Sequence, residues 1–541
     1  MCFEIKDRDL LGRVGRLETK SGVIETPALL PVVNPAIQLV KPERIKAIGY
    51  EALITNAYII KRRFGDEAAK LGIHRLLNFN GVIMTDSGAY QILVYGRVKT
   101  TPEEIVYYQE DIETDIATIL DIPTGWRNRK HAERTVRETI KRAKQLWSIK
   151  RKNDILWVGP IQGGRYTDLV RYSAKEISKL PYHIHALGSP TEVMERYLFP
   201  TLVDMIMAAK MNIPPNRPFH LFGAGHPVVF SLAVALGCDL FDSAAYAIYA
   251  RDNRYMTAQR TIKLNRLEYL PCSCPVCKSR SVEDLKEASP QEREKLIAEH
   301  NLYVCLSEVK TIKQAIVEGR LWEHLECRMH SHPSLINALK RIRRYVNYLE
   351  RHTPISKKAG ALFFTNLSLI RPEVYRHKAR LIGRFSPPRE SKILLLIPQT
   401  NEKPVHRSNE YKKLARNLNQ RLREKINTVH ICVYGIPFGL IPIELDATYP
   451  LSQFEASEPD EETLNYAASI VYAYIISKRY EIVILLRVRN EDLGFLVALA
   501  CDKACRELGI PFFDMEVDDI WIEETFIALL RKIEEFFKAQ S

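Results

Sequence analysis

The sequence predicts an α/β protein: a TIM-type (β/α)8 barrel with a zinc-binding subdomain, followed by a second, small α/β domain. Three observations predict this fold class. Residues 1 to about 245 alternate short β-branched runs with helical stretches, and a cysteine cluster follows them. The 541 residues also exceed the ~250–300 at which one hydrophobic core stops growing, so more than one domain is expected.

Eight segments of the first half have the composition of buried strands, and stretches with helical periodicity separate them. They are residues 27–33, 51–55, 81–85, 116–120, 155–161, 182–187, 218–222 and 238–241. Eight strands with intervening helices match a (β/α)8 barrel. A doubly wound open sheet is the main alternative. It is disfavoured because no G-x-G-x-x-G or P-loop motif follows any of these strands.

Polar residues or glycine stand just beyond these strands: Asn34, Asn56, Asp86, Asp121, Gln162, Gly188, His226 and Asp242. Because active sites of such barrels lie at the carboxyl ends of the strands, we expect three carboxylates and an amide to converge there. An aspartate after a strand is also a common helix N-cap, and this alternative stays open for each acid taken alone.

A metal site is predicted by the spacing C-x-C-x2-C at Cys272, Cys274 and Cys277, with His300 located 23 residues further on. Three thiolates and one imidazole complete a tetrahedral zinc shell with no open position, which indicates a structural role. Cys305 is an alternative fourth ligand. Three free cysteines in a loop are the other alternative.

Composition restricts the class of protein. Hydrophobic residues make up 46% and charged residues 26%, as in ordinary globular proteins. The net charge of +13 suits a polyanionic partner such as nucleic acid. No long apolar window predicts a membrane helix, the start lacks a signal peptide, and the other cysteines are scattered, so we expect a cytoplasmic protein.

The domain organisation follows from shifts along the chain. We expect a barrel domain over residues 1–352 that includes the zinc-binding subdomain at about 270–302. A basic connecting segment at 353–389 ends near "SPPRE", and an α/β domain occupies 390–541.

Six motifs occur in one order: "TDSGAYQ" (85–91), "PIQGG" (160–164), "ALGSP" (186–190), "HLFGAGHP" (220–227), "FDSAAYAIYAR" (241–251) and the cysteine motif. Together they resemble the tRNA-guanine transglycosylase family over residues 1 to roughly 385. The "SAAYA" and "RPEVYRHKARL" segments look archaeal. That resemblance implies replacement of a D-loop guanine in tRNA by preQ0 on the route to archaeosine.

The resemblance also implies roles for individual residues. Asp242 looks like the nucleophile that forms a covalent ribosyl enzyme, and Asp86 looks like the general acid/base of a retaining reaction. The substrate-binding residues it implies are Asp121 and Gln162 as purine readers, Gly163, Gly164 and Gly188 for close approach to the base, and Ser87 and Ser189. The family usually has glycine where this chain has Ser189. Tyr246 or Tyr90 is expected either to stack on the base or to serve packing.

The partners implied are tRNA, guanine and the preQ0 base, a second copy of the chain, and a separate protein with a PUA domain, since the tail shows no such module. We expect phosphate contacts, or a merely solvated face, from a basic group comprising Lys340, Arg341, Arg343, Arg344, Arg376 and Lys378. The segment "PQTNEKPVHRS" (398–408) lacks the cysteine of archaeosine-synthase-like relatives, so no second activity is expected there.

Three other functions are alternatives: a non-catalytic tRNA-binding paralogue or subunit, an archaeosine-synthase-like enzyme that acts on preQ0 already in tRNA, and an unrelated barrel glycosidase. The retained acids and cysteine motif disfavour the first. The missing cysteine at 398–408 disfavours the second, and the basic charge with the cysteine motif disfavours the third.

Overall fold

The computed structural model describes residues 3–89, 91 and 99–540, and it divides into two compact units, Met1–Thr353 and Pro354–Ser541. The first unit holds the barrel and the cysteine cluster. The predicted connecting segment 353–389 belongs, apart from its first residue, to the second unit.

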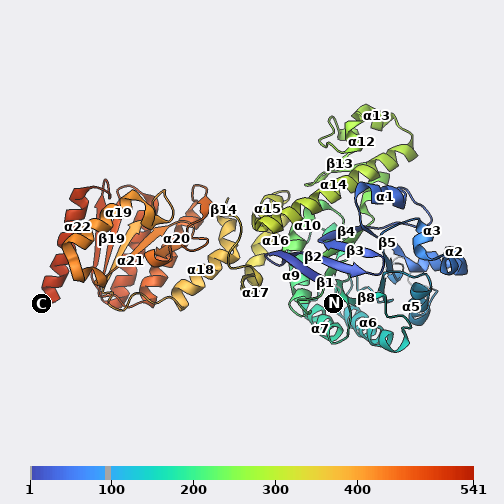
Figure 1. The fold of residues 1–541 in the computed structure, drawn as a ribbon, viewed down its shortest axis with the longest axis horizontal. Coiled ribbons are helices and arrows are strands. Elements are labelled where there is room, and N and C mark those ends of the chain that lie inside the picture. Colours follow the sequence, from blue (N-terminus) through green and yellow to red (C-terminus); the bar gives the residue numbers. More distant parts are fainter. Residues whose placement is uncertain (1–2, 90, 92–98, 541) are drawn as a thin grey trace. The chain divides into compact units, whose positions relative to one another are not determined.

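The first unit is a barrel of eight parallel strands with helices around it (Figure 1). The strands are β4 (Ala28–Pro31), β5 (Ala52–Asn56), β6 (Val82–Asp86), β7 (Ile116–Thr118), β8 (Leu156–Ile161), β9 (Ile184–Leu187), β10 (Phe219–Leu221) and β11 (Leu240–Ser243). Their order is β4-β11-β10-β9-β8-β7-β6-β5, and a bridge between Val32 and Ile54 closes the ring. Each strand overlaps one predicted segment, so the barrel prediction is confirmed and the open sheet is wrong.

Helices connect successive strands, as a parallel barrel requires. They are α1 (Pro42–Ile48), α2 (Ala57–Leu71), α3 (Ile73–Leu77), α5 (Pro102–Asp111), α6 (Arg129–Ile149), α7 (Thr167–Ser178), α8 (Thr191–Glu195), α9 (Phe199–Lys210) and α10 (Pro227–Ala235). The helix α11 (Ala245–Arg251) follows the last barrel strand, β11. Local sequence sets several of their starts. Thr101 and Glu104 form a capping box before α5, and the Asn128 side chain caps α6.

The barrel interior is apolar along most of its length. Its filling comes from alternate strand positions, among them Leu30, Ala52, Ile54, Val82, Met84, Ile116, Val158, Ala186 and Leu240. An antiparallel sheet of β1 (Phe3–Asp9), β2 (Gly12–Thr19) and β3 (Gly22–Thr26) adds Phe3, Leu17 and Ile24 to this core. Side chains alternate between the two faces of a strand. The next inward-facing residues beyond this apolar core therefore stand at the carboxyl ends of the strands.

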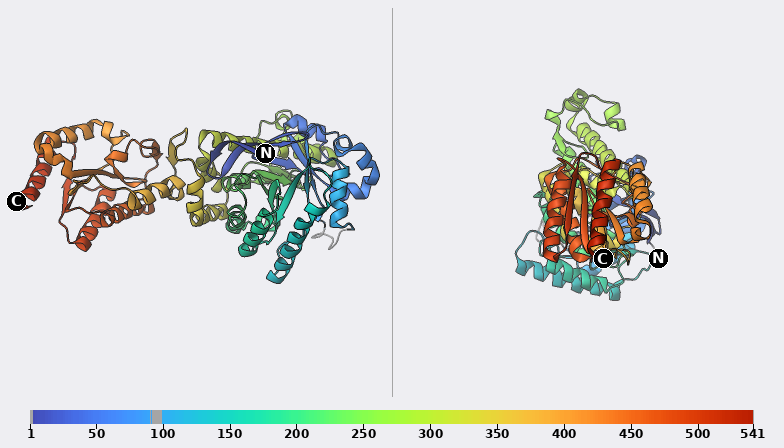
Figure 2. Two further views of the ribbon diagram at one scale, coloured as in Figure 1. Left: turned by 60° about the horizontal axis from the view of Figure 1, so that its bottom comes forward. Right: turned by 90° about the vertical axis from the view of Figure 1, so that its left-hand side faces the viewer.

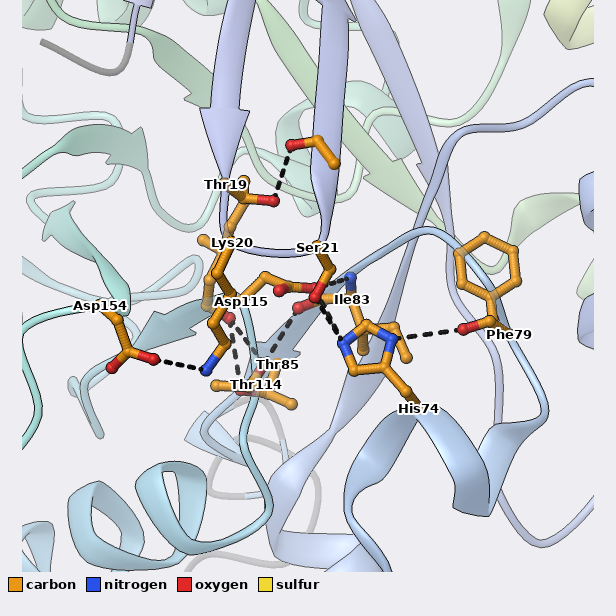
Figure 3. A network of polar contacts seen from close by, with 12 residues as sticks. Thr19, Lys20, Ser21, His74, Phe79, Ile83, Thr85, Thr114, Asp115 and Asp154 are labelled. Carbon is orange, nitrogen blue, oxygen red and sulfur yellow. Dashed lines mark hydrogen bonds and ion pairs between the residues drawn. The ribbon is translucent and has the colours of Figure 1, made fainter.

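The amino end of the barrel is tied together by polar contacts (Figure 3). The buried Asp115 carboxylate accepts from the Ile83 N–H at 2.7 Å and pairs with His74 Nε2 at 3.1 Å. His74 Nδ1 donates to the Phe79 carbonyl at 3.2 Å. Burial lowers the pKa of His74, but the hydrogen bond and charge of Asp115 outweigh it and the net pKa is raised. This network binds β6, β7 and α3 to one another, a structural role.

After the barrel come β12 (Arg254–Met256), β13 (Thr261–Lys263), α12 (Pro275–Lys278), α13 (Val282–Glu287) and the long helix α14 (Pro290–Glu318). These elements carry the cysteine cluster, and α12 and α13 lie beside one end of α14 (Figure 1). Three more helices complete the unit: α15 (Leu321–Met329), α16 (Pro333–Ile342) and α17 (Val346–His352).

The second unit is a three-layer α/β domain (Figure 2). Its sheet has the order β17-β16-β15-β19-β20, from β15 (Ile393–Pro398), β16 (Val429–Gly435), β17 (Gly439–Pro442), β19 (Ile482–Val488) and β20 (Phe512–Val517). One face packs on α19 (Asn409–Leu422) and α22 (Glu523–Gln540). The other packs on α18 (Pro372–Gly383), α20 (Glu461–Ser477) and α21 (Asp492–Leu508). A short pair, β14 (Ala361–Phe363) and β18 (Phe454–Ala456), lies apart.

Over the described residues, every helix is too short or too polar to span a lipid bilayer.

Candidate active site and metal site

A layer of polar side chains follows the apolar filling at the carboxyl end of the barrel. Asn56 and Asp86 end the paired strands β5 and β6, where they are in register with each other. Asp242 lies on β11, two positions after the inward Leu240, and His220 lies on β10. The strands that bury the core therefore present these four side chains at one mouth.

Asp86 stands in an environment that favours its protonated form. The Asn56 Nδ2 donates to Asp86 Oδ2 at 3.1 Å, and the Ser87 and Gly88 backbone also bond the carboxyl group. Desolvation by the surrounding protein raises the pKa of Asp86 to about 7, and the negative charges of Asp121 and Asp242 add to the rise. Near neutral pH this carboxyl group both holds and releases a proton.

Among the described residues, hydrogen-bond donors to Asp242 are found at only one of its two carboxylate oxygens. The Oδ1 atom accepts from His220 Nε2 at 2.8 Å and from the Gly223 N–H at 3.1 Å. The imidazole of His220 is fully buried, whereas the Asp242 side chain is 13% exposed. With Oδ1 held by two donors, Oδ2 is the oxygen that remains for a reacting atom.

A second group of polar side chains forms a buried hydrogen-bonded cluster after the carboxyl ends of β7 and β8. Gln162 Nε2 donates to Asp121 Oδ2 at 2.6 Å, while Gln162 Oε1 accepts from the Thr124 N–H at 3.1 Å and from the Ser189 hydroxyl at 2.9 Å. These bonds fix the orientation of the Gln162 amide and leave one Nε2 proton to donate. Burial raises the pKa of Asp121 to about 6, against the lowering effect of Gln162.

Three glycines lie in or beside this polar cluster. A Cβ on Gly188 would lie 2.2 Å from Gln162 Nε2, so any side chain there would displace the amide. Gly163 and Gly164 have φ of 144° and 55°, values that favour glycine. The Gly163 N–H donates to the Thr124 hydroxyl at 3.1 Å, which joins the loops after β7 and β8.

Ser189 has the same unusual backbone without being glycine, at φ 62°. Its hydroxyl oxygen accepts from the Thr124 N–H at 2.9 Å and the Gly125 N–H at 3.2 Å, while its proton goes to Gln162. The hydroxyl therefore links the β7 loop to the amide of Gln162.

The metal-ligand candidates lie together away from this mouth. The ligand atoms of Cys272, Cys274, Cys277 and His300 are all within 4.8 Å of one another, so this group could hold one metal ion. His300 Nε2 lies 2.9 Å from the Met256 carbonyl and donates to it, which leaves Nδ1 unprotonated. That Nδ1 lies 3.3 Å from Cys277 Sγ and 3.5 Å from Cys274 Sγ. The imidazole thus has the tautomer that a metal ligand needs.

The metal site is connected to the segment that follows Asp242. Asn301, next to His300, accepts from the Met256 N–H at 2.9 Å and donates to the Tyr246 carbonyl at 3.1 Å. Tyr246 belongs to α11, which begins three residues after Asp242. The cluster therefore anchors α14 against the helix behind the candidate nucleophile.

Comparisons with known proteins agree with this arrangement. A family model described as queuine tRNA-ribosyltransferase matches residues 8–334, more than half of the chain. The chain belongs to the tRNA-guanine transglycosylase family. A model for a domain of unknown function matches residues 374–517.

Relatives named tRNA-guanine(15) transglycosylase cover most of this transglycosylase-family chain. The one from Sulfolobus acidocaldarius is 42% identical over 492 residues, 90% of this chain and 95% of the relative. The one from Pyrobaculum aerophilum is 44% identical over 494 residues, with 90% and 96% covered. The one from Methanocaldococcus jannaschii is 43% identical over 470 residues, 85% of this chain but only 69% of a longer relative.

Several residues expected near the site of this transglycosylase-family chain lie elsewhere or have other partners. Tyr246 is buried and its hydroxyl donates to the Val32 carbonyl at 3.0 Å, a packing role, while Tyr90 lies outside the described residues. His226 accepts from the Val228 N–H as the N-cap of α10. Cys305 lies near the Gly225 carbonyl and outside the cysteine cluster, so it is not the fourth ligand.

Two members of the expected phosphate-binding group have partners within the chain. Arg341 forms an ion pair with Asp204, and Arg376 is buried and donates to the Pro354 carbonyl at 3.0 Å. Contacts to a nucleic acid by these two guanidinium groups would compete with these partners. Composition identified a basic stretch, but only packing shows which charges have partners.

Three residues of the site were missed by the sequence interpretation or given no role. His220 is the first residue of the "HLFGAGHP" motif. It lies two positions before Phe222, which packs against the barrel core, so side-chain alternation could have indicated that His220 points inward. Asn56 was noted only as a strand end. Thr124 gives no sequence signal, because its contacts to Gln162 and Ser189 join three loops that are far apart in the chain.

Proposed function

We propose that this chain exchanges a guanine in tRNA for preQ0 through a covalent ribosyl–Asp242 intermediate, in archaeosine biosynthesis. One observation carries the proposal. A carboxyl group with a pKa of about 7, Asp86, is electrostatically coupled to Asp242, and no described residue donates a hydrogen bond to the second oxygen of Asp242. A retaining exchange at an N-glycosidic carbon needs an acid/base and a nucleophile of this kind.

The exchange proceeds in two halves. Asp242 Oδ2 attacks C1′ of the ribose while the bond from C1′ to the purine nitrogen breaks, and Asp86 gives its proton to the departing guanine. The incoming base then loses a proton to Asp86 as its nitrogen attacks C1′ and the bond to Asp242 breaks. His220 and the Gly223 N–H stabilise the Asp242 carboxylate and hold its attacking oxygen in place.

We propose the polar cluster of Asp121, Gln162 and Ser189 as the base pocket, because guanine and preQ0 match its donors and acceptors. The Asp121 carboxylate is suited to accept from the ring N1–H and exocyclic amine, and the remaining Gln162 Nε2 proton is suited to the ring carbonyl. Adenine presents an amine where Gln162 needs an acceptor, so a buried donor would be left unpaired. Ser87 directly follows Asp86 in the chain and is fully buried.

The names of the relatives support guanine 15 as the exchanged nucleotide, in agreement with the D-loop expectation. That base must leave its stack or the arm must rearrange to reach the mouth.

Zinc is the ion we propose for the Cys272, Cys274, Cys277 and His300 site, since three thiolates and an imidazole form a closed tetrahedral shell. It holds α14 in place and takes no part in the exchange. Homodimerisation, a separate PUA-domain partner and a cytoplasmic location remain expectations from the resemblance and the composition.

Incorporation of radiolabelled guanine into unmodified tRNA tests the proposal. We expect incorporation by the wild-type chain, chased out by preQ0, and background levels for Asp242→Asn. Asp154→Asn, which changes an exposed carboxylate near Lys20, is the matched control and should retain full activity. Full incorporation by Asp242→Asn would exclude Asp242 as the nucleophile, and a non-catalytic tRNA-binding protein would show none for any variant.

A further inference from the structure

The three loops that build the base pocket also carry a basic and aromatic cluster. The loop after β7 holds Asp121 and Trp126, the loop after β8 holds Gln162 and Arg165, and the segment after β9 runs from Ser189 through α8 to Arg196. We call Trp126, Arg165 and Arg196 the rim cluster. Because all three loops leave the carboxyl ends of the strands, the rim cluster lies on the same barrel face as Asp86 and Asp242.

Two guanidinium groups share one indole ring. The Cζ of Arg165 lies 4.4 Å from the Trp126 ring centroid, and that of Arg196 lies 4.9 Å from it. Both arginines are exposed. Arg165 also lies over the ring of Tyr166, at 5.4 Å, and Nη2 of Arg165 is 3.4 Å from its hydroxyl.

Within the described part of the chain, no ion pair is found for Arg165 or Arg196. Other basic groups of the same unit are paired, as Arg129 is with Asp168 and Arg341 with Asp204. Two like charges held against one ring repel each other, so an anion placed between them would be favoured.

The stacking also prepares the arginines for a ligand. A guanidinium that lies over an aromatic ring can still use its outer N–H groups, and these match two oxygens of a phosphate. Part of the side-chain entropy that binding would cost has already been lost in the stacked state.

We propose that the rim cluster binds backbone phosphates of the RNA beside the nucleotide that enters the base pocket, one phosphate for each arginine. This inference rests on the proposed function, and it assigns to that function a specific docking surface. The place of these residues in the chain supports the proposal, since Arg165 directly follows Gly164 and Trp126 stands two residues after Thr124. An acidic protein segment is the other anion that would suit this surface, and the test separates the two.

The test is binding of unmodified tRNA to the full chain as a function of NaCl concentration. Each phosphate contact contributes about 0.7–0.9 to the slope of log affinity against log salt. The double variant Arg165→Ala/Arg196→Ala should therefore reduce the slope by about 1.4–1.8. Trp126→Ala keeps both arginines, and the double variant Arg165→Lys/Arg196→Lys keeps both positive charges. Each should therefore weaken tRNA binding and leave the slope nearly unchanged. Arg75→Ala, an exposed arginine on α3 before β6, is the matched control and should match the wild type.

Each outcome is informative. A slope of the double variant equal to that of the wild type would overturn the proposal. So would loss of polyglutamate binding with unchanged tRNA binding, which would assign the surface to an acidic protein. Binding of free guanine, measured by calorimetry, should be unaffected by the double variant. If the wild-type chain neither binds tRNA nor incorporates guanine, it is the proposed function that fails.

Discussion

At the scale of single residues, Ser189 in the proposed base pocket combines an unfavourable backbone conformation with favourable hydrogen bonds of its hydroxyl. A non-glycine residue in the left-handed region costs about 1–2 kcal/mol, and Ser189 adopts this region at φ 62°. In return its hydroxyl holds the Thr124 loop and fixes the Gln162 amide. Glycine at this position would remove the strain and the hydroxyl together.

Substitution of Ser189 separates these two effects. Ser189→Gly and Ser189→Ala both lose the hydroxyl, and we expect each to raise the KM for guanine about tenfold, as one or two lost hydrogen bonds imply. Only the glycine variant relieves the backbone, so it should be more stable than the alanine variant by about 1 kcal/mol. Urea unfolding and guanine incorporation measure the two quantities. A wild-type KM in both variants would contradict the positioning role of Ser189.

The raised pKa of Asp86 predicts a specific pH dependence. The acid form of Asp86 is present below about pH 7 and is lost above it, so kcat/KM for guanine incorporation should fall as pH rises through 7. Asp121 contributes to that raised pKa through its negative charge. In Asp121→Asn the fall in activity should therefore move to lower pH, besides a weaker affinity for the base. A shift to higher pH would contradict the electrostatic coupling.

Stability gives an independent check on the same group. The pKa of Asp86 in the folded chain lies above its ordinary value of 3.8, so its contribution to stability is present below pH 3.8 and is lost by about pH 7. We expect Asp86→Asn to remove this loss, which would be seen as a smaller fall in the unfolding temperature of the first unit between pH 4 and pH 7. An identical fall in wild type and variant would place the titration elsewhere.

At the scale of elements, the metal site determines how α14 is held. His300 and Asn301 are neighbours on this helix, and they connect the cysteine cluster to β12 and α11. Cys277→Ser should therefore lose the bound metal and increase amide hydrogen exchange over residues 270–318, while the barrel strands stay protected. Cys305→Ser, outside the cluster, is the control and should retain one metal ion per chain. A full metal content in Cys277→Ser would contradict the ligand set.

The eight barrel strands are the part of the fold that the sequence predicts well. All eight were located, since each is a short apolar run followed by a polar residue, and side-chain alternation then places Asp86 and Asp242 at one mouth. The contacts of Thr124 and Ser189 were not predictable, because they depend on which loops become neighbours when the barrel closes. The same holds for Arg376, which looks basic and exposed in sequence and is buried by packing.

At the scale of the whole molecule, each unit has its own hydrophobic core. We expect calorimetry to show two unfolding transitions. Leu395→Ala, at the centre of the second sheet, should destabilise only the second unit, by about 2–5 kcal/mol. Val158→Ala, in the barrel core, is the reciprocal control. A single transition that both variants shift equally would show that the two cores unfold together.

The proposed mechanism depends most on the covalent bond between Asp242 and ribose. The direct measurement is mass spectrometry of peptides from chain that was incubated with tRNA and denatured before the second half of the reaction. We predict a ribosyl adduct on the peptide containing Asp242, absent when Asp242→Asn is used. An adduct mapped to Asp86 or Asp121, or guanine exchange by the wild-type chain without any adduct, would contradict it.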